Sequence, residues 1–295
     1  MNVLGISPLT PAWISTRARG ISGTDVAAIL EVHPWKTQIE VWERIRSNST
    51  FEPREQTEAM YWGNVLEGVV LREWELRSGR KSYTAPGLVA DDELEWLLGT
   101  PDAFVMPERG SEAEFEVYEG KTGSAWKASD WDEGMPVPYA LQLQTYLMIT
   151  GAPRGHYAVL LGGQQFRFGE LDADPELHEL LRQRLKAWWN DHVVQGVMPQ
   201  PTARPEDRAV LDRLYPSDDG ATVALPPSVQ TDLESYFSAG ITVRELEAVR
   251  DEARNRILAA LGSATSGISA DFRASWKADR SGKRRFSVKP RPTNP

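Results

Sequence analysis

The chain has 295 residues, which is enough for one large domain or for one domain with a smaller appendage. With 41% hydrophobic and 25% charged residues it has the composition of a globular protein, which excludes wholesale disorder. It contains no cysteine, which excludes a disulfide scaffold, a thiol nucleophile, a thiolate-held iron–sulfur cluster and a zinc site with cysteine ligands. Its four histidines form no HxxxH pair, so a histidine-held zinc site is not expected either.

The charge is unevenly distributed along the chain. The formal net charge is −9, but the last 25 residues contain eight basic and two acidic residues and carry a net charge of +6. We therefore expect a basic tail beside a carboxylate-rich body. No apolar stretch approaches the length of a membrane span and the N-terminus does not resemble a signal peptide, so we expect a cytoplasmic protein without a membrane partner.

In chain order, the hydrophobic periodicity predicts helices, a cluster of strands, one helix, a hairpin and further helices. Helices are expected over residues 24–32, 38–47, 61–78 and 138–150, with Gly79 and Gly151 ending the last two. Strands are expected over residues 94–100, 103–106 and 114–122, and a hairpin over 156–163 and 165–171 that turns at Gly162-Gly163. This order predicts an α/β or α+β fold with a central mixed β-sheet flanked by helices.

The C-terminal third is predicted to be helical. Asp174-Pro175 begins a helix that reaches about Gln195, and a Pro-rich connector follows over residues 199–225. Thr242 and Glu245 have the spacing of a capping box, which predicts that a helix begins there and ends at Leu261, with a short strand in the basic tail. We therefore divide the chain into a core (1–198), the connector (199–225) and a helical C-terminal extension with the basic tail (226–295).

Strand 114–122 brings a carboxylate and an ammonium group together. Its period-two alternation places Phe115, Val117, Glu119 and Lys121 on one face, and the first two residues favour burial of that face. Such a pair at the edge of a core is costly unless it is paired or bound to something. The alternative is an ordinary ion pair at a solvated strand end.

A second carboxylate, Asp102, follows Pro101 just before another apolar run. Two oxygen ligands from separate strands suit Mg²⁺, which binds one or two carboxylates together with water and phosphate oxygens. Alone, however, a Pro-Asp pair is more often a simple turn. Glu67 lies on an apolar helix face with Gly63 and Val70, where an acid is either functional or a border residue.

Helix 138–150 carries Gln142 and Tyr146 one turn apart, with Gln144 close by. These polar groups interrupt an otherwise apolar helix, so they could orient a water molecule or a phosphate. An ordinary amphipathic face would give the same pattern.

Taken in order, Glu67, Pro101-Asp102, Glu119-x-Lys121 and Gln142-x-x-x-Tyr146 resemble the PD-(D/E)XK nuclease superfamily. Further stretches are similar to the YqaJ-type viral recombinase family, a relative of which is phage lambda exonuclease: Arg19–Asp25, Pro34–Thr37, Val41-Trp42, Tyr61–Gly63, Leu66-Glu67, Trp276-Lys277 and Arg284–Phe286. The resemblance covers residues 13–170 well and residues 225–290 more loosely.

The resemblance implies a restriction-endonuclease-like core and a metal-dependent nuclease. Asp102, Glu119, the carbonyl of Gly120 and Glu67 would hold Mg²⁺, with two ions expected and Mn²⁺ as a substitute. Lys121 would orient or deprotonate the attacking water, and Gln142, Gln144 and Tyr146 would complete the catalytic group. The middle residue of E-x-K is usually large and aliphatic in this superfamily, so Gly120 is a departure that permits either a bulge or a close backbone approach.

By the same resemblance, Arg17, Arg19, Ser22 and Thr24 would form a pocket for a 5′-terminal phosphate. Arginine forks and hydroxyl groups are suited to phosphate oxygens, although a helix N-cap with solvated arginines explains these residues equally well.

The implied activity is a Mg²⁺-dependent exonuclease that degrades duplex DNA ends 5′→3′ and leaves 3′ single strands for phage-type recombination. Its partners would be double-stranded DNA ends, a single-strand annealing protein and further copies of itself in a trimer, in the cytoplasm of a bacterial host. Three alternatives remain open: a PD-(D/E)XK endonuclease, a catalytically weak module that binds DNA ends, and an acidic protein-interaction domain.

Overall fold

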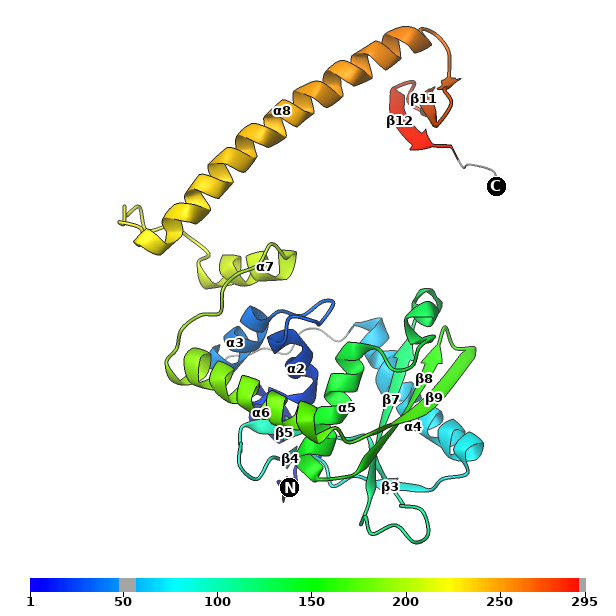
Figure 1. The fold of residues 1–295 in the computed structure, drawn as a ribbon, viewed down its shortest axis with the longest axis vertical. Helices are drawn as coiled ribbons and strands as arrows, with labels where there is room; N and C mark the ends of the chain where they lie inside the picture. Colours follow the sequence, from blue (N-terminus) through cyan, green and yellow to red (C-terminus); the bar gives the residue numbers. More distant parts are fainter. Residues whose placement is uncertain (48–56, 292–295) are drawn as a thin grey trace. The chain divides into compact units, whose positions relative to one another are not determined.

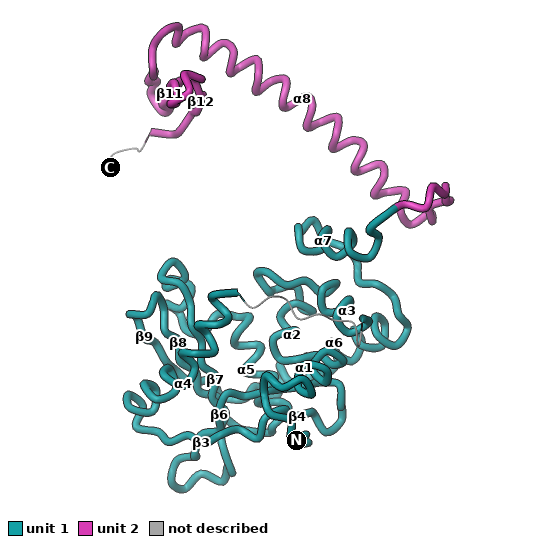
Figure 2. The backbone as a smooth tube through the Cα atoms, turned by 180° about the vertical axis from the view of Figure 1, so that it is seen from behind, with its two compact units in different colours: residues 1–217 teal, residues 218–295 magenta. Residues whose placement is uncertain are grey.

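The computed structural model describes residues 1–47 and 57–291 and divides into two compact units, one of residues 1–217 and one that begins at Asp218 (Figures 1 and 2). The first unit has the mixed α/β architecture that the sequence predicts, with mixed sheets flanked by helices.

A five-stranded mixed sheet forms the centre of the first unit (Figure 1). Its strand order is β3 (Ser82–Thr84), β6 (Ala103–Val105), β7 (Glu116–Gly123), β8 (Arg154–Leu161) and β9 (Gln165–Asp172). The central pair β7 and β8 is parallel, and the other neighbours are antiparallel. The connection from β7 to β8 runs through a 3₁₀ helix (Ala125–Trp131) and α5 (Val137–Thr150).

Two helices cover the opposite faces of this sheet. α4 (Glu58–Ser78) packs Val70 and Trp74 against Tyr118 and other small or apolar residues of β6 to β8. α5 packs Leu143 and Leu147 against the other face, which carries Val117, Val159 and Leu161. Because successive strand residues point to opposite faces, Glu119 and Lys121 lie on the α5 side with Val117.

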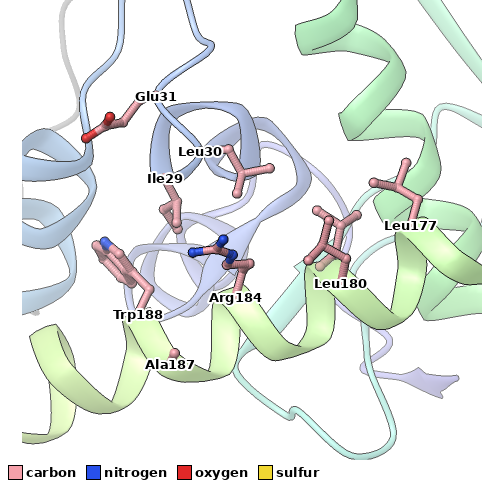
Figure 3. A pocket seen from close by; sticks show the side chains of 9 residues that line it. Ile29, Leu30, Glu31, Leu177, Leu180, Arg184, Ala187 and Trp188 are labelled. Atoms are coloured by element: carbon pink, nitrogen blue, oxygen red, sulfur yellow. The ribbon is translucent and has the colours of Figure 1, made fainter.

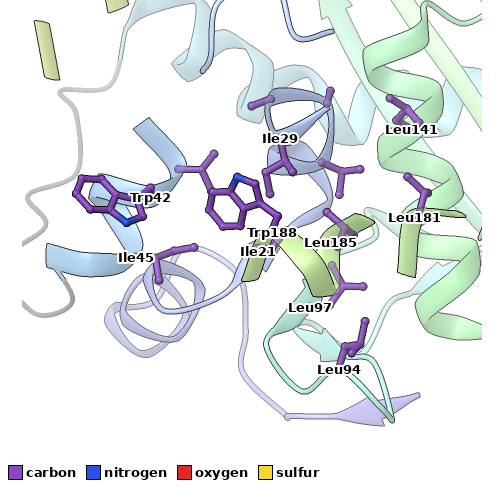
Figure 4. Packing of buried hydrophobic residues seen from close by; sticks show 14 of the residues in the cluster. Ile21, Ile29, Trp42, Ile45, Leu94, Leu97, Leu141, Leu181, Leu185 and Trp188 are labelled. Carbon is purple, nitrogen blue, oxygen red and sulfur yellow. The ribbon is translucent and has the colours of Figure 1, made fainter. Parts of the chain in front are cut away.

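A smaller four-stranded sheet completes the first unit, in the order β1 (Asn2–Val3), β4 (Val89–Ala90), β5 (Leu97–Gly99) and β2 (Ile21–Ser22). The helices beside it are α1 (Pro11–Ala18), α2 (Gly23–Ile29), α3 (Gln38–Ser47) and α6 (Pro175–Trp188), which continues as a π-helix (Trp189–Val194). Ile21, Ile29, Trp42, Leu185 and Trp188 form much of the hydrophobic cluster between these elements (Figure 4).

Several helix boundaries and one turn lie at the residues that the local sequence predicts. α4 and α5 end at Gly79 and Gly151, whose φ angles of 72° and 73° lie in the left-handed region that glycine adopts freely. The β8–β9 hairpin turns at Gly162 and Gly163, again with positive φ angles. The side chain of Asp174 caps α6 by accepting a hydrogen bond from the backbone N–H of Leu177.

The expected connector contains a helix. α7 (Pro205–Leu214) lies within residues 199–225 and is tied to α3, because Arg213 donates hydrogen bonds to both carboxylate oxygens of Glu43 at 2.5 and 3.0 Å. Val210 is fully buried against the first unit. These contacts place α7 in the first unit, and the division between the units falls after Ser217.

The second unit contains a short 3₁₀ helix (Pro227–Val229), α8 (Gln230–Leu261) and an antiparallel sheet of β10 (Ser266–Ile268), β11 (Phe272–Ala278) and β12 (Arg284–Pro290). The predicted helix start at Thr242 is wrong, because α8 begins twelve residues earlier, at Gln230. Thr242 instead donates a hydrogen bond from its hydroxyl to the carbonyl of Ser238 within the helix. The extension is therefore a helix followed by a sheet, and none of the described helices is long and apolar enough to cross a membrane.

Candidate active site

Glu119 and Lys121 of β7 share the face that the period-two pattern predicts. The Lys121 ammonium donates a hydrogen bond to Glu119 Oε1, and Gln142 of α5 donates another to the same oxygen at 2.6 Å. Glu119 is only 2% exposed. The Lys121 ammonium also lies 5.5 Å from the centre of the Tyr139 ring. The pair is therefore held inside the fold between the sheet and α5, which is not the position of a solvated ion pair.

The side chain of Asp102 is held at the same end of β7 by a hydrogen bond from the backbone. The backbone N–H of Gly120 donates a 2.7 Å hydrogen bond to Asp102 Oδ2. The β6–β7 register pairs Ala103 with Tyr118, so its continuation brings Pro101 opposite Gly120. The side chain of Asp102 thus accepts a hydrogen bond from β7 just beyond the end of the ladder, and it is anchored beside Glu119.

Close contacts around residue 120 explain why glycine fits at this position. A Cβ atom there would lie 3.3 Å from the Tyr118 hydroxyl oxygen, which is a tight contact, and 3.5 Å from Asp102 Oδ2, which is an ordinary one. The parallel pairing of β7 with β8 runs without interruption from Val117 to Gly123, so the strand has no bulge at this point. Of the two interpretations of Gly120, the structure supports the close approach.

The negative charges of Asp102, Glu119 and Glu67 repel one another, and this repulsion contributes to raised pKa values. Burial, followed by repulsion from Asp102, raises the pKa of Glu119 to about 8. Partial desolvation, followed by repulsion from Asp102, raises the pKa of Glu67 on α4 to about 7, although much of this residue remains exposed. Burial also raises the pKa of Asp102. Burial alone would lower the pKa of Lys121, but Glu119 and Asp102 outweigh it and hold the pKa above its usual value.

The donor set fits a hard divalent cation. Glu119 Oε2 is buried without a hydrogen-bond partner among the described residues, beside a second carboxylate whose charge is also unfavourable. A cation would satisfy this oxygen and relieve the repulsion. Within residues 1–47 and 57–291, no three histidine or acidic side chains lie close enough to hold an ion by themselves. Two carboxylates completed by water and phosphate suit Mg²⁺, which rarely has an all-protein cage.

The two glutamines of α5 face different parts of the protein. The Gln142 amide bridges Glu119 Oε1 and the Tyr146 hydroxyl, to which it donates at 3.0 Å. Gln144 points to the other side, where its amide donates to the carbonyl of Asp172 and its oxygen lies 2.7 Å from His178 Nε2. The structure therefore brings Gln142 and Tyr146 to the carboxylates but not Gln144.

Three of the four residues expected around a terminal phosphate lie together. Arg17 Nη2 donates to Thr24 Oγ1 at 2.8 Å and to Ser22 Oγ at 3.3 Å, and the two hydroxyl oxygens are 2.9 Å apart. Ser22 is also the N-cap of α2, so the capping and clustering interpretations both apply. Arg19 is exposed at the end of α1, and within the described parts of the chain its side chain has no hydrogen bond or ion pair. We name Arg17, Ser22 and Thr24 the hydroxyl–arginine cluster.

Asp25 supports this cluster and was missed in the sequence. Its Oδ2 accepts hydrogen bonds from the Ser22 backbone N–H at 2.7 Å, from the Ser22 hydroxyl at 2.6 Å and from Arg44 of α3 at 2.8 Å. Its Oδ1 accepts a hydrogen bond from the Lys36 ammonium. The Ser22-x-x-Asp25 spacing of a capping box was the available signal, but the two cations come from more distant parts of the chain.

The hydroxyl–arginine cluster adjoins the carboxylate group through α5. Gly23, the first residue of α2, lies so close to α5 that a Cβ atom would be 2.6 Å from Tyr146 Cε1 and 3.3 Å from Gln142 Cγ. Both the Arg17 guanidinium and the Glu119 carboxylate act on the pKa of the Tyr146 hydroxyl, Arg17 lowering it and Glu119 raising it, while burial has the largest effect and raises it. Tyr146 and Gln142 thus stand between the two groups.

A separate pocket of the first unit lies away from these residues. It is a pocket of about 560 Å³ between the end of α2 and α6, lined among others by Leu30, Leu180, Arg184 and Trp188 (Figure 3). None of the candidate catalytic, metal-binding or phosphate-binding residues lines it. Its lining is mostly apolar, with Glu31 and Arg184 as the charged residues, and it contains none of the convergent groups around Glu119, so the chemistry is assigned to the carboxylate group.

The chain is similar in sequence and in fold to known proteins. Over 269 residues the chain is 28% identical to the uncharacterized protein YqaJ of Bacillus subtilis (strain 168), which covers 90% of this chain and 82% of that protein. The crystal structure of LHK-Exo, an alkaline exonuclease from Laribacter hongkongensis, has a TM-score of 0.54 at 17% identity, covering 63% of this chain and 94% of that chain. LHK-Exo in complex with dAMP gives 0.53 at 19% identity, covering 70% and 97%.

At these identities the two crystal structures show the fold alone. All of the candidate site residues lie within residues 12–153, and the sequence of this segment matches one protein-family model. Residues 12–153 match the YqaJ-like viral recombinase domain, and the fold is similar to that of an alkaline exonuclease.

Proposed function

We propose that the protein is a Mg²⁺-dependent DNA exonuclease that hydrolyses phosphodiester bonds at duplex ends. The observation that carries the proposal is the convergence of Asp102, Glu119 and Lys121 at one strand end, with a buried carboxylate oxygen that lacks a partner among the described residues. The YqaJ-like domain and the alkaline-exonuclease fold support it.

Each residue of the group has a separate part in the reaction. Asp102 and Glu119 would hold the cation, with the Gly120 carbonyl and Glu67 as further ligands directly or through water. Bound Mg²⁺ stabilises charge on the phosphate and lowers the pKa of the attacking water. Lys121, whose ammonium lies beside Glu119, would orient the attacking water or stabilise the charge on the phosphate. Gln142 fixes Glu119 Oε1 and leaves Oε2 for the ion.

We propose 5′→3′ polarity because the hydroxyl–arginine cluster lies next to the carboxylate group across Tyr146 and Gln142. Arg17 would hold a 5′-terminal phosphate while the adjacent phosphodiester reaches the cation. The resulting 3′ single strands would serve phage-type recombination with an annealing protein, and the enzyme would act as a homo-oligomer, a trimer by resemblance, in the host cytoplasm.

Digestion of linear duplex DNA tests the proposal. We expect mononucleotides to be released in Mg²⁺, faster from 5′-phosphorylated than from 5′-hydroxyl ends, and no release in a chelator. A covalently closed duplex of the same sequence should remain intact. Cleavage of the closed duplex would favour an endonuclease, and binding to ends without any digestion would favour the end-binding module.

Replacement of Arg17 should remove the preference for a 5′-phosphate. Arg17→Ala loses the only guanidinium of the hydroxyl–arginine cluster, so digestion of phosphorylated ends should slow by about 10- to 100-fold, the value of a hydrogen bond to a charged group. Digestion of 5′-hydroxyl ends should change little. Arg19→Ala is the matched control, because Arg19 lies outside the cluster, and an equal loss in both variants would contradict the assignment.

The two glutamines of α5 form a second matched pair. Gln142→Ala should lower kcat by about 10- to 100-fold, because it removes the hydrogen bond that orients the Glu119 carboxylate. Gln144→Ala should leave kcat roughly unchanged but lower the free energy of unfolding by about 1–3 kcal/mol, because the buried Gln144 amide loses its hydrogen bonds to Asp172 and His178. Single-turnover digestion and chemical denaturation separate the two effects, and a catalytic loss confined to Gln144→Ala would reverse the assignment.

A further inference from the structure

The β11–β12 hairpin of the second unit collects basic side chains on one face. In an antiparallel ladder, directly opposed residues point to the same side of the sheet. The register opposes two cations at each end of this face and two serines between them: Arg273 with Lys289, Ser275 with Ser287, and Lys277 with Arg285. The serine hydroxyl oxygens are 2.8 Å apart. We name these six residues the cationic face.

The other face of the hairpin is apolar and packs toward α8. It carries Phe272, Trp276 and Phe286, and a Cβ atom on Gly267 of the adjoining strand would lie 2.9 Å from Leu261 of α8. Arg284 also belongs to this side, where its guanidinium stacks 3.6 Å from the Trp276 ring centre and donates to the carbonyls of Gly262 and Ala264. Arg284 therefore has a structural task, and the cationic face is directed away from this packing.

The arrangement of the cationic face is unfavourable in the absence of an anion. Like charges directly opposite one another destabilise a sheet, and here both pairs are alike. Arg285 has a partner in Asp279 at 3.1 Å. Over the described ranges, the charged groups of Arg273, Lys277 and Lys289 have no ion pair or hydrogen bond with the protein. The protein as a whole is acidic, with a net charge of −9, so this local concentration of positive charge stands out from the rest of the chain.

We propose that the cationic face is a second nucleic-acid site that contacts the phosphates of duplex DNA away from the reacting end. The choice of DNA as the polyanion rests on the proposed function. Lysine, arginine and serine are the side chains that contact phosphate oxygens without reading sequence. Sites for single strands depend on exposed aromatic rings for stacking, whereas the aromatic residues of this hairpin, Phe272, Trp276 and Phe286, lie on the opposite face.

The dimensions of the face also suit a duplex. Residues 273 and 277 are four positions apart on β11, which is roughly 13 Å at the rise of a β-strand. This separation is comparable to the major groove, which is about 12 Å wide and is bordered by the phosphates of both strands. Each pair of cations can therefore lie against one border of the groove, with the serine hydroxyls between them.

A second contact on the same duplex would keep the enzyme on its substrate between cuts. The segment from Tyr215 to Pro226 contains neither helix nor strand, so it is a tether between α7 and the second unit. When one unit releases DNA, a tether holds it at a high effective concentration near the same molecule. The cationic face would therefore increase the number of nucleotides removed per encounter without taking part in hydrolysis.

The test compares two full-length variants that lose the same number of charges. In the first variant, Arg273, Lys277, Arg285 and Lys289 become glutamine. In the matched control, four arginines of α8 become glutamine: Arg244, Arg250, Arg254 and Arg256. Binding to an internally labelled, covalently closed dumbbell duplex is followed by fluorescence anisotropy in a chelator, over a range of KCl concentrations. Circular dichroism establishes that both variants retain their helices and sheets.

We expect the first variant to flatten the plot of log K against log salt by about 3 to 4 units, since each phosphate contact contributes about 0.9. The control should keep the slope of the unchanged protein. Equal slopes in both variants would overturn the proposal and make an acidic protein surface the better partner for this face. Because the dumbbell has no end and the chelator prevents cleavage, the slopes do not depend on nuclease activity. Failure of the proposed function would therefore leave this result interpretable.

Discussion

Asp102→Asn and Glu119→Gln should each slow Mg²⁺-dependent digestion of linear duplex DNA by at least about 1,000-fold, a loss typical of removing an essential electrostatic group. Each substitution exchanges one carboxylate oxygen for an amide nitrogen of nearly the same size. The amide nitrogen cannot bind a hard cation, so the site loses a ligand while its shape is retained. The measurement is the initial rate of nucleotide release at saturating Mg²⁺.

The same variants should remain folded, and this separates loss of the ion from loss of structure. Without a cation the buried Glu119 carboxylate carries an unfavourable charge, because burial and Asp102 raise its pKa to about 8. Glu119→Gln removes this charge but also takes the carboxylate partner from Lys121, so its melting temperature in a chelator should stay close to that of the unchanged protein. The unchanged protein should be stabilised by added Mg²⁺, because the ion binds only the folded state, and both variants should lose this gain.

Asp91→Asn is the matched control for these variants. Asp91 is also buried, but it accepts hydrogen bonds from Arg182 and from the backbone of Glu93 and Leu94, at a place that the site residues do not share. Its replacement should lower the melting temperature and keep the stabilisation by Mg²⁺. Full digestion by Asp102→Asn, or an undiminished Mg²⁺ effect in that variant, would refute the assignment of the metal ligands.

The sequence predicted those parts of the site that depend on local periodicity. Glu119 and Lys121 share a face because a strand repeats every two residues, and Gln142 contacts Tyr146 because a helix brings residues four apart together. Gln142 and Gln144 could not be separated in this way. α5 is buried over residues 141–149, so it has no exposed face from which its orientation could be inferred. Only the packing of α5 between the sheet and α2 determines which glutamine meets Glu119.

The features that the sequence did not predict depend on contacts between distant segments. The role of Gly120 follows from the register of β6 against β7, which places Asp102 beside its backbone N–H. The start of α8 was misplaced because the S/T-x-x-E pattern of Thr242 and Glu245 also occurs inside helices, and the preceding residues continue the helix without a break. Arg17 and Arg19 look alike in sequence, but only Arg17 lies on the side of α1 that meets Thr24.

Asp25 links the hydroxyl–arginine cluster to the core, and its replacement should have a large effect on stability. The carboxylate is 1% exposed and is bound to Arg44 and Lys36. Arg44 in turn donates to the carbonyls of Arg17 and Gly20 at 2.6 and 3.0 Å, so the network fixes the chain between α1 and α2. Asp25→Asn should lower the free energy of unfolding at pH 7 by about 3–5 kcal/mol, because two cations lose their buried partner.

The pH dependence of this loss tests its electrostatic origin. Burial alone would raise the pKa of Asp25, but Arg44, Lys36 and Arg17 outweigh it and hold the pKa far below its usual value. A carboxylate with a lowered pKa in the folded state stabilises the protein above its unfolded pKa of about 4, and this contribution is lost as the pH falls below that value. The difference in the free energy of unfolding between the unchanged protein and Asp25→Asn should therefore narrow by about 1.4 kcal/mol per pH unit below about pH 4.

Chemical denaturation at pH 7, 5 and 3, monitored by tryptophan fluorescence, measures this difference. We expect the difference to be equal at pH 7 and pH 5 and smaller at pH 3. Digestion assays at pH 7 should show a second consequence, because Ser22 loses the acceptor that orients its hydroxyl: Asp25→Asn should weaken the preference for 5′-phosphorylated ends as Arg17→Ala does. A destabilisation that stays constant down to pH 3 would show that Asp25 acts through its shape and hydrogen bonds. Its charge would then have no part in holding the hydroxyl–arginine cluster in place.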